Sequence, residues 1–123
     1  MPFIEIIAPP LPEAARQAVA AGITTALCEA FAVGPQTVTA YFIEVPASHC
    51  AHAGALGETQ RLFVKVHAYR RGVAERRRAA ALLTPLLAAG YGVPAKALAL
   101  YFLDRAPDEV AHAGVLASEA VAA

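Results

Sequence analysis

The sequence predicts an α/β (α+β) fold made of two tandem strand–helix–strand units. Two observations predict it: an internal repeat at an offset of 60 residues, and the same order of periodic patterns in each copy. We expect a four-stranded mixed sheet with both helices on one face and a pseudo-two-fold relation between the units. The chain of 123 residues is then a single domain, 1–123, with repeat units at about 1–60 and 61–120.

The repeat is clearest in the second part of each unit. The stretch YFIEVPASHCAHAGAL from Tyr41 matches YFLDRAPDEVAHAGVL from Tyr101 without a gap. The same offset pairs Phe3 with Phe63 near the start of each unit. Two copies are too few for a solenoid, so a duplicated, pseudo-symmetric domain is the expected architecture.

Each unit opens and closes with a strand. Residues 2–8 and 62–68 alternate as opening strands, and residues 37–45 and 97–105 close the units. The strands of one unit should run parallel through a right-handed crossover. Because the closing strands are apolar on both faces, both faces of the sheet need cover. The helices cover one face, and we expect neighbouring copies in a symmetric oligomer to cover the other.

A helix joins the two strands of each unit. Residues 13–32 form the first helix, and residues 74–89 form the second. Pro85 lies inside the second helix and predicts a kink or an early helix end there. Arg76 aligns with Arg16, which favours a shared structural role for these two side chains.

Composition and charge argue against several classes of protein. Ten basic and ten acidic residues give no net charge, so no long-range attraction to nucleic acid is expected. The uncharged run 79–95 contains prolines and glycines and is shorter than the ~20 apolar residues of a membrane span. Cys28 and Cys50, without a signal peptide, predict a reduced, cytoplasmic chain. The HCAH cluster at 49–52 lacks a recognised fourth metal ligand, so no metal site is predicted.

Pro2 stands directly behind the initiator methionine, at the start of a strand. Proline is tolerated at a strand's first residue, so a purely structural reading stays open. If Met1 is removed, Pro2 carries a secondary amine. An α-amino group titrates near ~7.7–8.0, and burial or a nearby arginine lowers its pKa toward neutrality, where a general base works best. Its repeat partner is Leu62, so each chain carries one such amine.

The two units also differ in their cations. If the opening strands pair in antiparallel fashion, Pro2 faces the segment 67–71, which contains Arg70 and Arg71. Neither arginine has a basic counterpart in the first unit. One unit then supplies the base and the other the cations. We interpret this asymmetry as functional, because a structural duplication does not need it.

A penultimate proline that opens a strand, in a tandem strand–helix–strand chain of this length, resembles the tautomerase superfamily, which includes 4-oxalocrotonate tautomerase. The segments LPEAARQAVAAGIT, FIEVPA, YRRG and LYF resemble its fused members in the cis-3-chloroacrylic acid dehalogenase group. The resemblance covers nearly the whole chain. It implies a homotrimer that needs no cofactor and acts on a small carboxylate substrate.

The resemblance also implies roles for three residues. Pro2 matches the catalytic proline, Arg70 the first carboxylate-binding arginine and Tyr101 the active-site tyrosine. Tyr101 aligns with Tyr41, so a role in the core stays open for it.

Three positions depart from the dehalogenase pattern. Leu27 replaces a histidine, Val73 replaces the second arginine and His112 replaces a water-activating glutamate. Arg71 is the candidate to replace the missing arginine, and we count His112 with the two arginines as substrate-binding candidates. Since AHAG occurs in both units, a turn role stays open for His112.

The sequence therefore predicts a keto–enol tautomerase of small 2-oxo or 2-hydroxy-enoic acids. Pro2 would move a proton between oxygen and carbon, Arg70 would hold the carboxylate, and Tyr101 would donate a hydrogen bond to the oxyanion. Two alternatives stay open: a cis-3-haloacrylate dehalogenase or hydratase, and a non-catalytic trimeric binding protein. The physiological substrate and the removal of Met1 are not determined by the sequence.

Overall fold

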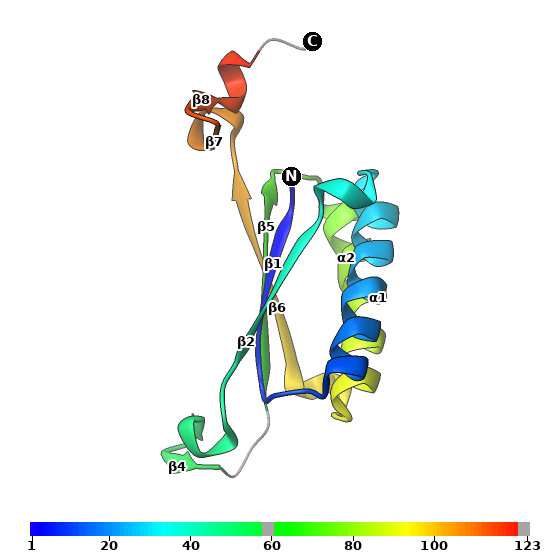
Figure 1. The fold of residues 1–123 in the computed structure, drawn as a ribbon, viewed down its shortest axis with the longest axis vertical. Helices are drawn as coiled ribbons and strands as arrows, with labels where there is room; N and C mark the ends of the chain where they lie inside the picture. Colours follow the sequence, from blue (N-terminus) through cyan, green and yellow to red (C-terminus); the bar gives the residue numbers. More distant parts are fainter. Residues whose placement is uncertain (58–60, 121–123) are drawn as a thin grey trace.

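A computed structural model describes residues 1–57 and 61–120 of the chain (Figure 1). The same elements occur in the same order in both halves. The first half contains β1 (Phe3–Ala8), α1 (Glu13–Phe31), β2 (Thr39–Glu44), β3 (Ala51–His52) and β4 (Ala55–Leu56). The second half contains β5 (Leu62–Tyr69), α2 (Val73–Tyr91), β6 (Leu98–Arg105), β7 (Ala111–His112) and β8 (Val115–Leu116).

Four strands form one mixed sheet in the order β2-β1-β5-β6. The strands of each unit are parallel, and β1 and β5 pair in antiparallel fashion at the centre. Phe3 lies opposite His67, and Ile7 lies opposite Phe63. The start of β1 therefore lies beside the end of β5, as predicted, and the predicted tandem architecture is confirmed.

Both helices cover the same face of the sheet (Figure 1). Alternate residues of β1 and β5 point under them, and regularly spaced apolar residues of the helices pack against these strands. The helices approach closely at Gly90, where a Cβ atom would lie 2.5 Å from Cγ2 of Val19. The core formed in this way contains Ile4, Ile6, Val19, Ile23, Leu27, Leu62, Val64, Val66, Leu83 and Leu87.

Helix α2 continues through Pro85 to Tyr91, so the predicted early helix end is wrong. Proline removes the hydrogen bond to the carbonyl four residues earlier, on Ala81. Both residues are exposed, so water can donate to that carbonyl instead. The buried leucines on either side of the proline, Leu83 and Leu87, keep the helix on the sheet.

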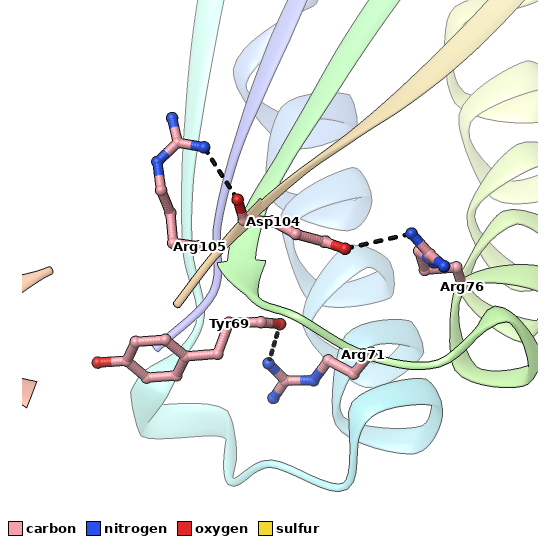
Figure 2. A network of polar contacts seen from close by, with 5 residues as sticks. All are labelled: Tyr69, Arg71, Arg76, Asp104 and Arg105. Atoms are coloured by element: carbon pink, nitrogen blue, oxygen red, sulfur yellow. Dashed lines mark hydrogen bonds and ion pairs between the residues drawn. The ribbon is translucent and has the colours of Figure 1, made fainter. Parts of the chain in front are cut away.

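An ion pair connects each helix to the closing strand of its own unit. Arg16 Nη1 lies 3.1 Å from Glu44 Oε2. Figure 2 shows the second pair, in which Arg76 Nη1 lies 3.2 Å from Asp104 Oδ2. The two arginines are repeat partners, as are the two acids. The shared structural role predicted for these arginines is confirmed.

The AHAG segments form tight hairpins, β3-β4 and β7-β8, which lie beyond opposite ends of the main sheet (Figure 1). Ala113 and Gly114 both have positive φ, of 52° and 81°, as the central residues of a type I′ turn require. The hairpin holds His112 just before this turn, near the end of β5.

The sheet face opposite the helices carries exposed apolar side chains in the described part of the chain. We call this surface the open face; its members include Phe3, Tyr41, Ile43, Phe63 and Tyr101. None of the helices described here is long and apolar enough to cross a bilayer.

Candidate active site

A pocket of about 500 Å³ opens where the start of β1 meets the ends of β5 and β6. The antiparallel pairing of β1 with β5 creates this meeting point, and the β7-β8 hairpin and the start of β2 complete the wall. We call it the first pocket. It is lined by Met1, Pro2, Phe3, Thr37, Thr39, Tyr41, His67, Ala68, Tyr69, Arg105, Val110 and His112.

Pro2 lies in the first pocket with its side chain fully buried. Its carbonyl accepts a hydrogen bond from the Thr39 N–H at 3.3 Å, so it continues the pairing of β1 with β2 although it has no N–H of its own. Met1 precedes it in this structure and is largely exposed. Burial and, to a lesser extent, the nearby Arg71 guanidinium lower the pKa of the terminal amine below its ordinary value.

Among the described residues, Arg70, Arg71 and Arg105 lie near this end of the sheet, in different positions. Arg105 lines the first pocket, and its Nη1 donates to the carbonyl of Asp104 at 3.1 Å (Figure 2). Arg71 Nη1 donates to the carbonyl of Tyr69 at 2.8 Å, and its Cζ lies 4.7 Å from the centre of the Phe31 ring. Arg71 is therefore held in place beside the chain terminus, by a hydrogen bond and a cation–π contact.

Two histidines contribute to the wall of the first pocket. His112 Nε2 lies 3.3 Å from the Tyr69 hydroxyl. The His67 ring stacks on Phe3 with centroids 4.1 Å apart, and its Nε2 lies 2.6 Å from Glu5 Oε1. The stacking and the hydrogen bond to Glu5 fix His67 in one orientation, whereas the Tyr69–His112 pair lies at the exposed rim.

The structure brings together some of the residues predicted from the sequence. Pro2 and His112 line the first pocket, and Arg71 acts on the terminal amine. Arg70 has an exposed side chain and does not line the pocket, although its backbone N–H donates to the Arg105 carbonyl at 3.1 Å.

Tyr101 lies on the open face, outside the first pocket. Its ring stacks on Phe63 with centroids 6.3 Å apart, toward the far end of the sheet. Tyr41, its repeat partner, lines the first pocket in its place.

Sequence reasoning missed Arg105, Tyr69 and Tyr41 as residues of the pocket. A signal for Arg105 was available, because its repeat partner is Val45 and it ends the strand beside β5. The asymmetry that selected Arg70 and Arg71 applies equally to Arg105.

No protein-family model matches the sequence, and no curated protein matches it. Solved structures do match. A fused 4-OT solved as an asymmetric trimer has a TM-score of 0.88 at 19% identity, over 94% of this chain and 96% of that chain. Pt0534 inactivated by 2-oxo-3-pentynoate has a TM-score of 0.86 at 20% identity, over 94% of this chain and 97% of that chain. FG41 malonate semialdehyde decarboxylase inhibited by 3-bromopropiolate has a TM-score of 0.72 at 19% identity, over 89% of this chain and 87% of that chain.

The chain shares its fold with these solved structures, a fused 4-OT among them. Identities of 19–20% establish the fold alone. The reaction has to be inferred from the residues that line the first pocket. The described lining of the first pocket offers Pro2, which follows Met1, together with the guanidinium of Arg105 and the hydroxyls of Tyr41 and Tyr69. Among the described residues that line it, none is a carboxylate. The described part of the chain holds no group of three or more His, Cys, Asp or Glu residues that could bind a metal ion.

Proposed function

We propose that this protein is a cofactor-independent tautomerase of small 2-oxo or 2-hydroxy-enoic acids, with Pro2 as general base and acid after removal of Met1. One observation carries the proposal: the opening proline lies buried in a pocket that Arg105 also lines. A substrate carboxylate bound by the guanidinium would lie within the same 500 Å³ as the proline nitrogen.

The proposed reaction needs one proton and no other reactant. The neutral Pro2 nitrogen accepts the proton of the enol hydroxyl, the C–O bond becomes a carbonyl, and the electrons of the C=C bond take a proton at carbon from the prolyl ammonium. The amine is then regenerated. A hydroxyl of the pocket wall, from Tyr41 or Tyr69, can donate a hydrogen bond to the oxygen while its charge develops.

The environment of the chain terminus suits such a base. Burial and the Arg71 guanidinium lower the pKa of the amine in the chain that carries Met1. We expect both effects on the Pro2 amine, since its ring is more deeply buried than the methionine. An amine with a pKa near neutrality is partly unprotonated at pH 7, as a general base requires.

The proposal includes a homotrimer. The fused 4-OT whose structure matches this chain assembles as a trimer, and the apolar open face requires cover of this kind. In a trimer, Tyr101 would meet a substrate from a neighbouring chain, because it lies outside the first pocket of its own chain.

The same pocket argues against hydration or dehalogenation as the main reaction. Adding water to a haloacrylate needs a second group to activate that water, and no carboxylate lines the described pocket. The Tyr69–His112 pair is the remaining candidate for this task. A trimeric binding protein without chemistry stays as the outcome if no turnover is found.

The test is ketonisation of phenylenolpyruvate and 2-hydroxymuconate, followed by ultraviolet absorbance. Pro2→Ala is the matched variant, because alanine at this position also leaves a free amine when methionine is removed. We expect the variant to lose about 10²-fold or more in kcat/KM. Intact mass establishes that both proteins lack Met1. A wild-type rate no higher than that of Pro2→Ala would contradict the proposed function.

A further inference from the structure

A second pocket, of about 350 Å³, lies at the opposite end of the sheet, where the end of β1 meets the start of β5. The repeat relates it to the first pocket. Most of its lining lies 60 residues from a residue of the first pocket; these members are Ile7, Ala8, Pro9, Val45, Cys50 and Phe63. The second pocket is therefore the pseudo-symmetric counterpart of the candidate active site.

The position of the chain terminus is taken by an arginine in the second pocket. Arg61 lines it, and Arg61 is the repeat partner of Met1. The next residue is Leu62, whose nitrogen is a backbone amide and not a basic amine. The second pocket thus holds a permanent cation where the first holds an amine, and the imidazole of His49 is the basic group among its described lining residues.

The facing wall is apolar where the first pocket is polar. Arg105, Tyr69 and His67 have Val45, Pro9 and Ile7 as their repeat partners. These three residues and Phe63 give the pocket an apolar part in addition to its cation, and His49 and Cys50 also line it. None of the described residues that line it carries a carboxylate that would compete for the guanidinium.

The Arg61 guanidinium is positioned from the neighbouring hairpin. Its Nη2 lies 3.2 Å from His52 Nε2, at the end of β3. An imidazole nitrogen that accepts this bond uses one of the five guanidinium N–H donors. The other donors suffice for bidentate binding of a carboxylate.

We propose that the second pocket binds a small monocarboxylate with an apolar body and does not turn it over. Arg61 holds the carboxylate, and the apolar wall of Ile7, Val45 and Phe63 packs against the body of the ligand. Each chain then has two related pockets with different tasks: proton transfer at the chain terminus and binding alone at Arg61. This inference does not depend on activity in the first pocket.

The test is a titration of the full-length protein with benzoate, an apolar monocarboxylate that cannot tautomerise. Calorimetry measures affinity and stoichiometry for the wild type and for Arg61→Gln, Arg61→Lys and Arg105→Gln. Arg77→Gln is the matched control, because it removes one guanidinium from the exposed surface of α2. Thermal unfolding of each variant establishes that it is folded.

We expect one binding event to weaken about tenfold or more in Arg61→Gln, and to persist in Arg77→Gln and Arg105→Gln. Arg61→Lys should restore part of the affinity. Val45→Glu, which places a negative charge on the apolar wall, should abolish the same event without any change at Arg61. In the wild type, nuclear Overhauser effects should connect benzoate protons to the methyl groups of Ile7 and Val45.

Benzoate binding that is unchanged in both Arg61→Gln and Val45→Glu would overturn the proposal, as would the absence of binding in the wild type. Neither result would affect ketonisation by the first pocket, and an inactive first pocket would leave the benzoate result standing. The two proposals can therefore fail separately.

Discussion

At the scale of single residues, the differences between repeat partners decide the chemistry of the two pockets. The repeat partner of Pro2 is Leu62, and that of Arg105 is Val45. The strands that carry the two members of each pair occupy equivalent places in the two units. A few side chains therefore make one end of the fold a candidate catalytic site and the other a pocket with Leu62 in place of the proline.

We expect different effects when the arginines near the first pocket are replaced, because they differ in position. Arg105 lines the pocket, so Arg105→Ala should lower kcat/KM. The expected loss corresponds to roughly 2–4 kcal/mol of transition-state stabilisation. The resemblance predicts the same loss for Arg70→Ala, whereas the exposed position of Arg70 predicts a small effect. Steady-state kinetics of the two single variants separates these assignments. A larger loss in Arg70→Ala would show that Arg105 is not the carboxylate-binding residue.

Covalent labelling tests the mature chain terminus and its pKa together. We expect 2-oxo-3-pentynoate or 3-bromopropiolate to add once per chain, at the Pro2 nitrogen. Burial and Arg71 lower the pKa of the Met1 amine, and we expect the same direction for the Pro2 amine, so neutral Pro2 should persist to lower pH than a proline amine in a free peptide. The labelling rate should rise as pH increases through that pKa and then level off. Removing the positive charge in Arg71→Ala should move the midpoint upward.

Intact-mass spectrometry with peptide mapping measures both parts of this prediction. Arg77→Ala serves as the control for a lost guanidinium on an exposed helix surface. A mass that includes Met1, or an adduct on Cys28, Cys50 or a lysine, would leave Pro2 with only a structural role.

The sequence predicted some site residues and not others, for a geometric reason. Pro2 could be placed from the sequence because it directly follows Met1 at the start of the first strand. Arg105 was missed because its contact with the pocket depends on the register of β6 against β5, where it pairs with Tyr69. The choice between Tyr41 and Tyr101 depends on which end of the sheet each ring reaches, and a repeat alone cannot distinguish them.

At the scale of elements, the apolar periodicity of the sequence predicted where the helices lie. The early helix end was wrongly predicted from a single residue, Pro85. Proline inside a helix costs about 3 kcal/mol relative to alanine. Burial of Leu87 beyond Pro85 offsets part of this cost, since a fully buried leucine contributes about 1.5–3 kcal/mol. Propensity at one residue is therefore a weaker signal than the apolar spacing of the whole helix.

The C-terminal ends of the two helices carry different residues at equivalent repeat positions. We use this difference to predict a change in stability. Ala32 ends α1 with φ of 53°, and its repeat partner Gly92 ends α2 with φ of 66°. The left-handed conformation costs a non-glycine residue roughly 1–2 kcal/mol, and glycine avoids this cost. Part of the advantage of glycine is lost because glycine has greater conformational freedom in the unfolded chain. Ala32→Gly should therefore stabilise the protein by about 0.5–1 kcal/mol.

Gly92→Ala is the matched reverse change and should destabilise the protein by a similar amount. Urea unfolding followed by circular dichroism measures both variants at one protein concentration, because assembly would shift the transition. The same sign of effect in the two variants would contradict the argument from backbone conformation.

At the scale of the whole molecule, the duplication places related pockets at opposite ends of the sheet and leaves the open face exposed. The helices of both units cover one face, and no element formed by residues 1–57 and 61–120 covers the other (Figure 1). Phe3, Ile43 and Phe63 are each 39% exposed there, and Tyr41 and Tyr101 are more exposed still. Glu5 and Lys65 lie opposite each other between these residues, and several exposed large apolar side chains on one face are typical of an interface between subunits.

This surface predicts a homotrimer whose stability depends on the open face. Sedimentation at micromolar concentration should give three times the chain mass of 12.8 kDa. Ile43→Lys places a charge on the open face and should shift the protein toward monomer, because the ammonium would lose water in the interface. Val73→Lys is the control, since Val73 is 59% exposed at the start of α2, on the helical side. If the wild type sediments as a monomer, or if both lysine variants assemble as the wild type does, the open face is not the subunit interface. Tyr101 then has no neighbouring pocket to reach, and the hydrogen bond to the substrate oxygen has to come from Tyr41 or Tyr69 of the same chain.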